Sequence, residues 1–219
     1  MLERHRISIV IPALNEARTI AAVVIGAARY GMPIVVDDGS HDDTGERAFQ
    51  AGAKVVRHAV NRGYDEALNS GLLHASELGC EYVVTLDADG QHDPGTLEAF
   101  IRALDGGADI VIGVRDRRQR VAETIFAWVT ALKWGIRDPL CGMKAYRIGV
   151  WRELGHFDSY SSIGTELALF AAASRKRVVQ VPVKTRDRAD GPRFGRRFLA
   201  NGRILRALWI GMSQPAQRP

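Results

Sequence analysis

The stretch YVVTLDADGQHDP, residues 82–94, places a short apolar run directly before three aspartates. Its first five residues are typical of a buried β-strand, because β-branched and aromatic side chains favour strands. Asp87, Asp89 and Asp93 then follow within seven positions. Carboxylates at the edge of a core repel one another and destabilise the fold unless a cation lies among them. The stretch therefore predicts a strand end that is built around a positive charge.

The same strand pattern recurs along the first half of the chain, with helical patterns between the strands. Strands are predicted at residues 7–13, 33–36, 55–56, 82–86 and 110–114, and helices at 16–30, 43–51, 66–78 and 94–104. Apolar strands that alternate with helices are typical of an α/β fold with a mostly parallel central sheet and helices on both faces. Three strands run into PALNE, VDDGS and LDADGQ. Because ligands bind beyond the carboxyl ends of such strands, we expect these segments to form one site.

The pattern changes after residue 115. A basic loop precedes a helical stretch with aromatic residues at 121–136, followed by a predicted helix at 165–174 and a predicted strand at 178–184. The chain ends in an arginine-rich amphipathic pattern. We predict one α/β domain over residues 1–195, and a basic amphipathic C-terminal helix and tail over 196–219 that is not an independent domain.

Composition narrows the classes of partner without choosing one. The 219 residues are 46% hydrophobic and 25% charged, as in ordinary globular proteins, and the formal net charge is +5. This charge favours anionic partners, but nucleic acid is disfavoured because no reader motif accompanies the basic clusters. The two cysteines, Cys80 and Cys141, suit packing in a reducing cytoplasm. No signal-peptide pattern or bilayer-spanning apolar stretch is present, so we expect neither export by that route nor a transmembrane protein.

The residue types after the fourth predicted strand suit a divalent metal ion. Asp87 and Asp89 are two positions apart, which in extended backbone points both carboxylates to one side. Such oxygen ligands suit Mg²⁺ or Mn²⁺ shared with substrate phosphates, and Gln91 offers a further carbonyl oxygen. Asp93 is predicted to cap the helix that starts at the next residue. His92 is interpreted as solvated or as a hydrogen-bond partner of a ligand, and is left out of the metal site.

A second acidic segment, VVDDGSHDDT at residues 35–44, follows the second predicted strand. Gly39 and Ser40 form a predicted turn, with Ser40 or Asp42 as the helix N-cap. One carboxylate of the Asp37–Asp38 pair can accept the amides of that turn, or instead the imide N–H that uracil and guanine share. Dinucleotide-binding glycine patterns and the P-loop are both absent from the sequence. A diphosphate would therefore be held by metal and arginine.

Four segments in this order and spacing, SIVIPALNEARTI, VVDDGSHDDT, NRGYDEALNSGL and LDADGQHDP, resemble glycosyltransferase family 2 with its GT-A fold. The later segments GVR, DPLCGMKAYR, TELAL and PVKTRDRADG resemble the polyprenol-phosphate sugar transferases, the dolichol-phosphate mannose synthase group. The resemblance covers roughly residues 6–195, which would make the first domain the GT-A catalytic domain.

The resemblance implies a nucleoside-diphosphate sugar donor, inversion at the anomeric carbon, and a set of roles for matching positions. The implied nucleotide-sugar-binding residues are Pro12, Leu14, Glu16, Val36, Asp38, Asp87, Ala88, Arg188 and Arg193, with Asp38 on the base. The implied metal and diphosphate residues are Asp87, Asp89 and Gln91. The implied catalytic residues are Asp89, Glu166, Arg115 and Asp138, with Arg115 near phosphate and Glu166 and Asp138 near the acceptor.

Two departures from the family pattern affect these assignments. Gly191 is followed by a proline and then by Arg193. The family carries a cation after this glycine, and in this sequence the cation comes one position earlier than the family pattern has it. The hydrophobic C-terminal spans of many bacterial relatives are also missing from this sequence. The sequence therefore does not decide which residue binds the diphosphate. It also does not decide how the protein would reach a membrane.

The chemistry leaves three readings of the function. A polyprenyl phosphate acceptor is already anionic and needs no strong base, whereas a glycan hydroxyl needs one, for which Glu166 is the first candidate. The leading hypothesis is a metal-dependent transfer of a sugar from a UDP- or GDP-linked donor to polyprenyl phosphate. The alternatives are a soluble family 2 enzyme that acts on a glycan hydroxyl, and a non-catalytic protein that binds nucleotide sugar or lipid.

The C-terminal pattern has two readings of equal weight. Arginines interleaved with apolar residues are typical of a helix lying on an anionic membrane surface, and equally of a helix packed on the domain with a solvated basic face. The aromatic stretch at 126–134 is interpreted first as core and second as a membrane contact. We expect a cytoplasmic protein that is peripheral on the inner face of the cell membrane, with a separate membrane-spanning partner as a possible companion.

Overall fold

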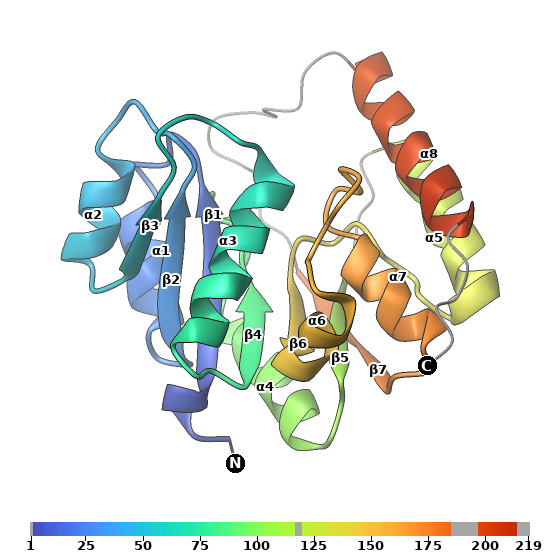
Figure 1. Cartoon of the computed structure of the whole chain (residues 1–219), viewed down its shortest axis with the longest axis horizontal. Helices are drawn as coiled ribbons and strands as arrows, with labels where there is room; N and C mark the ends of the chain where they lie inside the picture. Colours follow the sequence, from blue (N-terminus) through green and yellow to red (C-terminus); the bar gives the residue numbers. More distant parts are fainter. Residues whose placement is uncertain (1, 117–119, 185–196, 214–219) are drawn as a thin grey trace.

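The computed structural model describes residues 2–116, 120–184 and 197–213, and it has a mixed α/β fold built on one seven-stranded sheet (Figure 1). The strands are β1 (Ile7–Ala13), β2 (Met32–Asp37), β3 (Lys54–Arg57), β4 (Tyr82–Thr85), β5 (Ile110–Arg115), β6 (Lys144–Arg147) and β7 (Val178–Val183). The helices are α1 (Ile20–Ala27), α2 (Thr44–Gln50), α3 (Tyr64–Glu77), α4 (Leu97–Asp105), α5 (Val121–Trp134), α6 (Ile148–Leu154), α7 (Glu166–Ala173) and α8 (Arg197–Ser213). Two short 3-10 helices are η1 (Arg4–Arg6) and η2 (Pro94–Thr96).

The strand order is β3-β2-β1-β4-β6-β5-β7, and every pairing is parallel except those of β6. The predicted α/β class with a mostly parallel sheet is thus confirmed. The antiparallel strand β6 and the helix α6 were not predicted. β6 has only four residues, KAYR, of which two are basic, so it lacks the apolar run by which the other strands are recognised.

Helices cover both faces of the sheet, as expected. On β1, Ile9 and Ile11 pack in one apolar cluster while Val10 packs in the other, because successive strand residues point to opposite faces. The first cluster includes residues of α1 and α4, and the second includes residues of α3, α5, α6, α7 and α8. Because both faces are buried, the central strands β1, β2, β4 and β5 need to be largely apolar, and that is the pattern in the sequence.

Capping predictions were right at one helix and wrong at another. Asp93 accepts a hydrogen bond from the N–H of Gly95 at 3.0 Å and caps η2, which leads into α4. Helix α2 begins after Asp43, so the predicted N-caps are misplaced. Asp42 accepts the N–H of Thr44 at 3.0 Å, while Ser40 accepts the N–H of Asn15 from the loop after β1. The Ser40 hydroxyl therefore joins two strand-end loops instead of starting a helix.

The C-terminal helix α8 packs beside α5 on one flank of the molecule (Figure 1). Ile204, Ala207 and Leu208 of α8 are buried, as is Phe126 of α5, so each helix contributes to the core. In the described part of the chain, no helix combines the length and apolar character that crossing a bilayer requires. The division into a domain over 1–195 and a helix and tail over 196–219 stays a prediction.

Candidate active site

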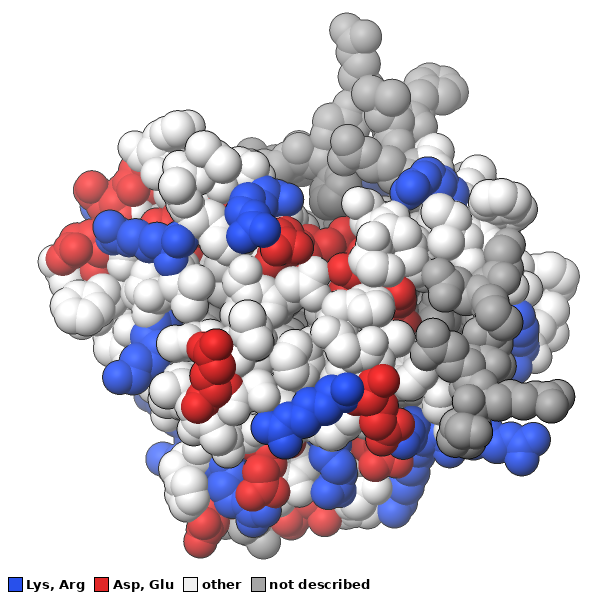
Figure 2. All heavy atoms as spheres, in the orientation of Figure 1, with Lys and Arg blue, Asp and Glu red and all other residues white. Residues whose placement is uncertain are grey.

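The candidate site lies at the sheet edge where the parallel strands end. In Figure 2 acidic side chains gather in the upper middle of the molecule, between the top of α3 and the loops above α6 and α7. β6 runs against its neighbours, and Lys144, its first residue, is paired with Thr85, the last residue of β4. The start of β6 therefore lies at the same edge as the carboxyl ends of β1, β2 and β4.

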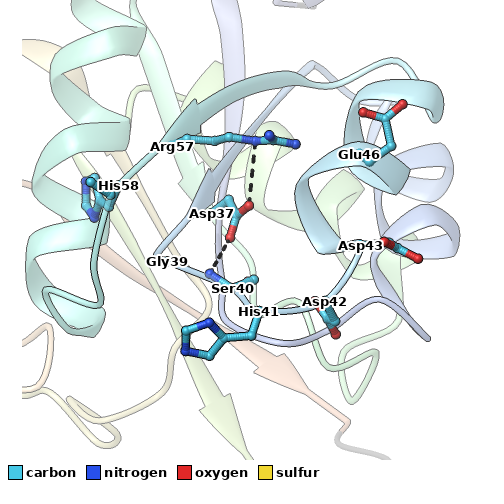
Figure 3. Close-up of a pocket in the computed structure, with 10 residues that line it drawn as sticks. Asp37, Gly39, Ser40, His41, Asp42, Asp43, Glu46, Arg57 and His58 are labelled. Carbon is cyan, nitrogen blue, oxygen red and sulfur yellow. Dashed lines mark hydrogen bonds and ion pairs between the residues drawn. The ribbon is translucent and has the colours of Figure 1, made fainter.

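Asp37 lies in a hollow of about 370 Å³ at the ends of β2 and β3 (Figure 3). Its Oδ1 accepts the N–H of Ser40 at 3.0 Å, and its Oδ2 is 3.8 Å from Nε of Arg57. His41 and His58 are also among the residues that line the hollow, although the ring of His58 points away from Asp37 (Figure 3). The prediction that one carboxylate of the pair accepts an amide of the turn is confirmed at Asp37.

Asp38 points into a different set of partners. Its Oδ1 accepts the N–H of Arg62 at 2.8 Å and lies 2.7 Å from Nδ1 of His58, and its Oδ2 accepts the N–H of Gly63 at 2.8 Å. Nε2 of His58 lies 2.9 Å from the hydroxyl of Ser70 on α3. Asp38 is only 4% exposed, so its orientation is determined by these contacts. His58 has no recognisable signal in the sequence, because its partner Asp38 lies 20 positions away in the chain.

The loop after β1 joins the two acidic segments. Pro12 is paired with Val36 across β1 and β2, and the N–H of Glu16 donates to the hydroxyl of Thr44 at 2.8 Å. The hydroxyl of Thr19 donates to the carbonyl oxygen of Ala88 at 2.8 Å. The structure thus brings together the positions predicted for the nucleoside pocket, which are Pro12, Leu14, Glu16, Val36 and Asp38. The bond from Thr19 ties Ala88, predicted on the diphosphate side, to the same loop.

Asp87 is enclosed by groups that stabilise its charge. The hydroxyl of Tyr64 donates to Oδ1 at 3.3 Å, and Nε2 of His92 lies 3.4 Å from Oδ2. Burial alone would raise the pKa of Asp87, but the hydrogen bond and charge of His92, with Tyr64 and Lys144, hold it below its usual value. Asp87 is therefore a carboxylate at neutral pH, as a metal ligand needs to be.

His92 is buried, with 6% of its surface exposed, and this differs from the solvated alternative considered for it. Burial lowers the pKa of His92, but the carboxylates of Asp87 and Asp89 outweigh that effect and raise it above its usual value. Nδ1 of His92 is buried without a hydrogen-bond partner among the described residues. The interpretation of His92 as a hydrogen-bond partner of a ligand matches its contact with Asp87.

Asp89 lies in a tight turn and not in extended backbone. β4 ends at Thr85, one residue earlier than predicted, and residues 88–89 form a turn. The argument from alternating strand geometry therefore does not apply to Asp87 and Asp89. Oδ1 of Asp89 accepts the N–H of Gln91 at 3.0 Å, so the turn itself positions this carboxylate beside the predicted third ligand.

Lys144 is a buried basic side chain next to these acids, and it was not predicted from the sequence. It is 2% exposed, and its Nζ donates to the carbonyl oxygen of Cys141 at 2.6 Å. Burial lowers the pKa of Lys144, whereas the nearby charges, including those of Asp138 and Asp87, oppose the shift. Lys144 and His92 are thus the basic side chains that lie beside the run of aspartates after β4. The signal of Lys144 in the sequence, a lysine within a short strand, is too weak to recognise.

The donor set fits Mg²⁺ or Mn²⁺ shared with a diphosphate. Among the described residues, no group of three or more His, Cys, Asp or Glu side chains is arranged to hold a metal ion. Mg²⁺ in enzymes is commonly held by one or two carboxylates together with substrate phosphates. The carboxylate of Asp87 lies against Gly142, where an added Cβ would come within 2.4 Å of Oδ2. Only glycine leaves room for the carboxylate there.

Arg115 and Asp138 form a buried pair. Asp138 accepts Nε of Arg115 at 2.8 Å, its Nη2 at 2.9 Å and its backbone N–H at 3.0 Å. Glu123 joins the group through Nη2 of Arg115 at 3.3 Å and Nη1 of Arg120 at 3.1 Å. Asp138 is 2% exposed. The pair therefore ties the loop after α5 to the end of β5, and Glu123 ties the start of α5 to the same point.

Glu166 is also surrounded by donors. It accepts the N–H of Ser159 at 2.6 Å and the Ser159 hydroxyl at 2.9 Å, and Nε2 of His156 lies 2.9 Å from its Oε1. Two further acids lie nearby, Asp65 at the start of α3 and Asp158 in the loop before α7. Burial and the charge of Asp158 raise the pKa of Asp65 to about 6. Neither was singled out in the sequence, because they come together only when the start of α3 meets the loop before α7.

Two predicted residues, Arg188 and Arg193, lie outside the described residues. Their proposed contact with phosphate stays a prediction.

Comparison with known proteins identifies the family. The family model described as "Glycosyl transferase family 2" matches residues 8–147. The chain therefore belongs to glycosyltransferase family 2, as the sequence motifs predicted.

The names of the curated relatives of this chain differ in how specifically they state an activity. An uncharacterized glycosyltransferase of Mycobacterium tuberculosis is 32% identical, over 90% of this chain and 91% of the relative. An undecaprenyl-phosphate 4-deoxy-4-formamido-L-arabinose transferase of Edwardsiella ictaluri is 31% identical, over 84% of this chain and 61% of the relative. A polyprenol monophosphomannose synthase of Mycolicibacterium smegmatis is 29% identical, over 85% of this chain and 80% of the relative.

A solved structure agrees in fold. Glucosyl-3-phosphoglycerate synthase of Mycobacterium tuberculosis, in complex with Mn²⁺, uridine diphosphate and phosphoglyceric acid, superposes with a TM-score of 0.76. It is 26% identical, and the match covers 98% of this chain and 80% of that one. The names of two of the curated relatives thus refer to undecaprenyl phosphate and to a polyprenol monophosphate sugar, whereas the solved structure holds phosphoglyceric acid.

Proposed function

We propose that this protein transfers a sugar from a nucleoside-diphosphate sugar, with inversion, to a polyprenyl phosphate at the inner face of the cell membrane. The observation that carries the proposal is the convergence of Asp38, Asp87 and Asp89 on one sheet edge, with Lys144 buried beside them. Close-set carboxylates of this kind suit a divalent ion that is bridged to a diphosphate.

The donor would lie across the ends of β1, β2 and β4. Asp38 would accept the imide N–H of a uracil or guanine base at Oδ2, which accepts the N–H of Gly63 and keeps a second lone pair, and the loop from Pro12 to Glu16 would enclose the nucleoside. Mg²⁺ or Mn²⁺, held by Asp87 and Asp89 with help from Gln91, would supply Lewis-acid stabilisation of the leaving diphosphate. Tyr64 and His92 would keep Asp87 ionised and oriented, and Arg188 and Arg193 would approach the phosphates.

The acceptor is argued from the surroundings of Glu166 and from the relatives. Glu166 already accepts three hydrogen bonds within the protein, so it is poorly placed to take a proton from a hydroxyl. A phosphate monoester is anionic near neutral pH and attacks without that proton transfer. Relatives with polyprenyl and undecaprenyl phosphate in their names support the same choice. We propose that Glu166, with Arg115 and Asp138, borders the acceptor.

Titration calorimetry with UDP and GDP, with and without Mn²⁺, tests donor binding. Metal-dependent binding of one nucleotide is expected, with at least a tenfold loss in Asp89→Asn and little change in Asp93→Asn, a nearby aspartate that caps η2. Binding that ignores both Mn²⁺ and Asp89→Asn would contradict the enzyme assignment. It would instead favour a non-catalytic binding protein.

Transfer from a radiolabelled donor tests the acceptor. Product on undecaprenyl or dolichyl phosphate is expected, with modest loss in Glu166→Gln. The second candidate is a soluble enzyme that glycosylates a hydroxyl, which the phosphoglyceric acid bound by the solved relative favours. In that case lipid phosphate would give no product, and Glu166→Gln would abolish turnover on the hydroxyl acceptor with unchanged donor affinity.

A further inference from the structure

Helices α5 and α8 lie side by side and leave large apolar side chains exposed to solvent. On α5 the exposed fractions are 75% for Val121, 44% for Ile125, 66% for Trp128 and 69% for Leu132. Their spacing of four, three and four residues places them in one stripe along the helix. On α8 Leu205 and Trp209, four residues apart, are 43% and 71% exposed. We call these six residues the α5–α8 flank.

The flank is not explained by packing within the domain. Phe126 of α5 and Ile204, Ala207 and Leu208 of α8 already fill the core, so both helices are apolar on a buried and on a solvent-facing side. The flank holds six of the twelve large apolar side chains that are exposed in the described part of the chain. Concentrated apolar surface of this kind marks an interaction site.

Charge on the two helices indicates the kind of partner. The only acidic residue in the sequences of α5 and α8 is Glu123, which is 5% exposed and bonded to Arg115 and Arg120. Lys133 and Arg206 are exposed on the same helices. A cationic apolar surface attracts anionic lipid, and it would repel an identical surface of a second copy.

We infer that the α5–α8 flank docks this protein on a bilayer that contains anionic phospholipids. Trp128 and Trp209 suit the boundary between headgroups and acyl chains, where tryptophan is enriched, and the cationic side chains face the headgroups. The α5 end of the flank adjoins the buried Arg115–Asp138 pair through Arg120 and Glu123. This geometry brings a lipid phosphate at the bilayer surface to the edge of the site, and this step rests on the proposed function.

Vesicle flotation of the full chain tests the inference without donor or acceptor. Vesicles of phosphatidylcholine with 30% phosphatidylglycerol are expected to carry the protein upward, and pure phosphatidylcholine much less. Trp128→Ser with Trp209→Ser is expected to lower the partition coefficient at least tenfold. Phe49→Ser is the matched control, because Phe49 is 66% exposed on α2, on the other side of the sheet (Figure 1). Equal far-ultraviolet circular dichroism of all variants checks their folding.

Three outcomes would overturn the inference. The first is that the unaltered protein does not float with anionic vesicles. The second is that Phe49→Ser weakens binding as much as the double variant. The third is that the double variant dissociates a dimer seen by sedimentation while vesicle binding is absent, which would assign the flank to a second copy. Vesicle binding without any transfer to lipid phosphate would contradict the proposed function alone.

Discussion

Replacing Asp138 by asparagine tests whether the buried pair with Arg115 holds the candidate site together. Asparagine keeps the shape of aspartate but replaces one oxygen by an NH₂ group and removes the charge. Asp138 accepts three hydrogen bonds from Arg115, through both carboxylate oxygens. In at least one of these contacts, the NH₂ group of asparagine would face an N–H donor of Arg115. The guanidinium, whose side chain is only 16% exposed, would lose its closest counter-charge.

The expected cost follows from burial. Removing one partner of a buried ion pair destabilises proteins by about 3–5 kcal/mol. Glu123 remains 3.3 Å from Nη2 of Arg115 and offsets part of this loss. We therefore expect Asp138→Asn to lower the free energy of unfolding by about 2–4 kcal/mol. Glu98→Gln is the control, because Glu98 pairs with Arg102 four residues along α4, with side chains 55% and 74% exposed. It should cost about 0.5 kcal/mol or less.

Urea unfolding followed by circular dichroism at pH 7 measures both variants. With a slope of about 2 kcal/mol per molar urea, the midpoint of Asp138→Asn should fall by roughly 1–2 M, and that of Glu98→Gln by little. Adding 0.5 M NaCl should reduce only the Glu98 effect, since exposed pairs are screened and buried pairs are not. A loss below about 1 kcal/mol for Asp138→Asn, equal to that of the control, would refute the structural role of the pair.

Two further predictions concern the packing and charge of the site. Gly142→Ala would push a Cβ against the carboxylate of Asp87 and is expected to weaken Mn²⁺-dependent nucleotide binding about tenfold or more in calorimetry. Gly149→Ala is the control, because a Cβ there meets no atom within 4 Å, and nucleotide binding should be unchanged. The raised pKa of Asp65 means that the folded protein keeps a proton that the unfolded chain releases between about pH 4 and 6, so stability falls as pH rises through this window. Asp65→Asn should therefore raise the free energy of unfolding by up to about 3 kcal/mol at pH 8 and much less at pH 4.5, and equal gains at both values would contradict the reasoning.

Some of the site was readable from local patterns. Strands buried on both faces must be apolar, so Tyr82 to Thr85 was recognisable, and the acids after it could only be stable beside a cation. The cap at Asp93 was equally local, because a helix N-cap depends on residues within one turn. Those patterns determined the fold class, the sheet edge that carries the site, and the family.

Tertiary structure alone decided which groups meet at that edge. Lys144 reaches the aspartates because β6 inserts between β4 and β5 in the reverse direction, and no local pattern predicts such a pairing. Asp138 meets Arg115 across 23 positions, and the exposure of Trp128 depends on which side of α5 the sheet and α8 leave uncovered. The sequence by itself specifies periodicity and local capping, which act over a few residues. Strand order, burial of charge and exposed apolar surface depend on long-range packing, which only the folded chain defines.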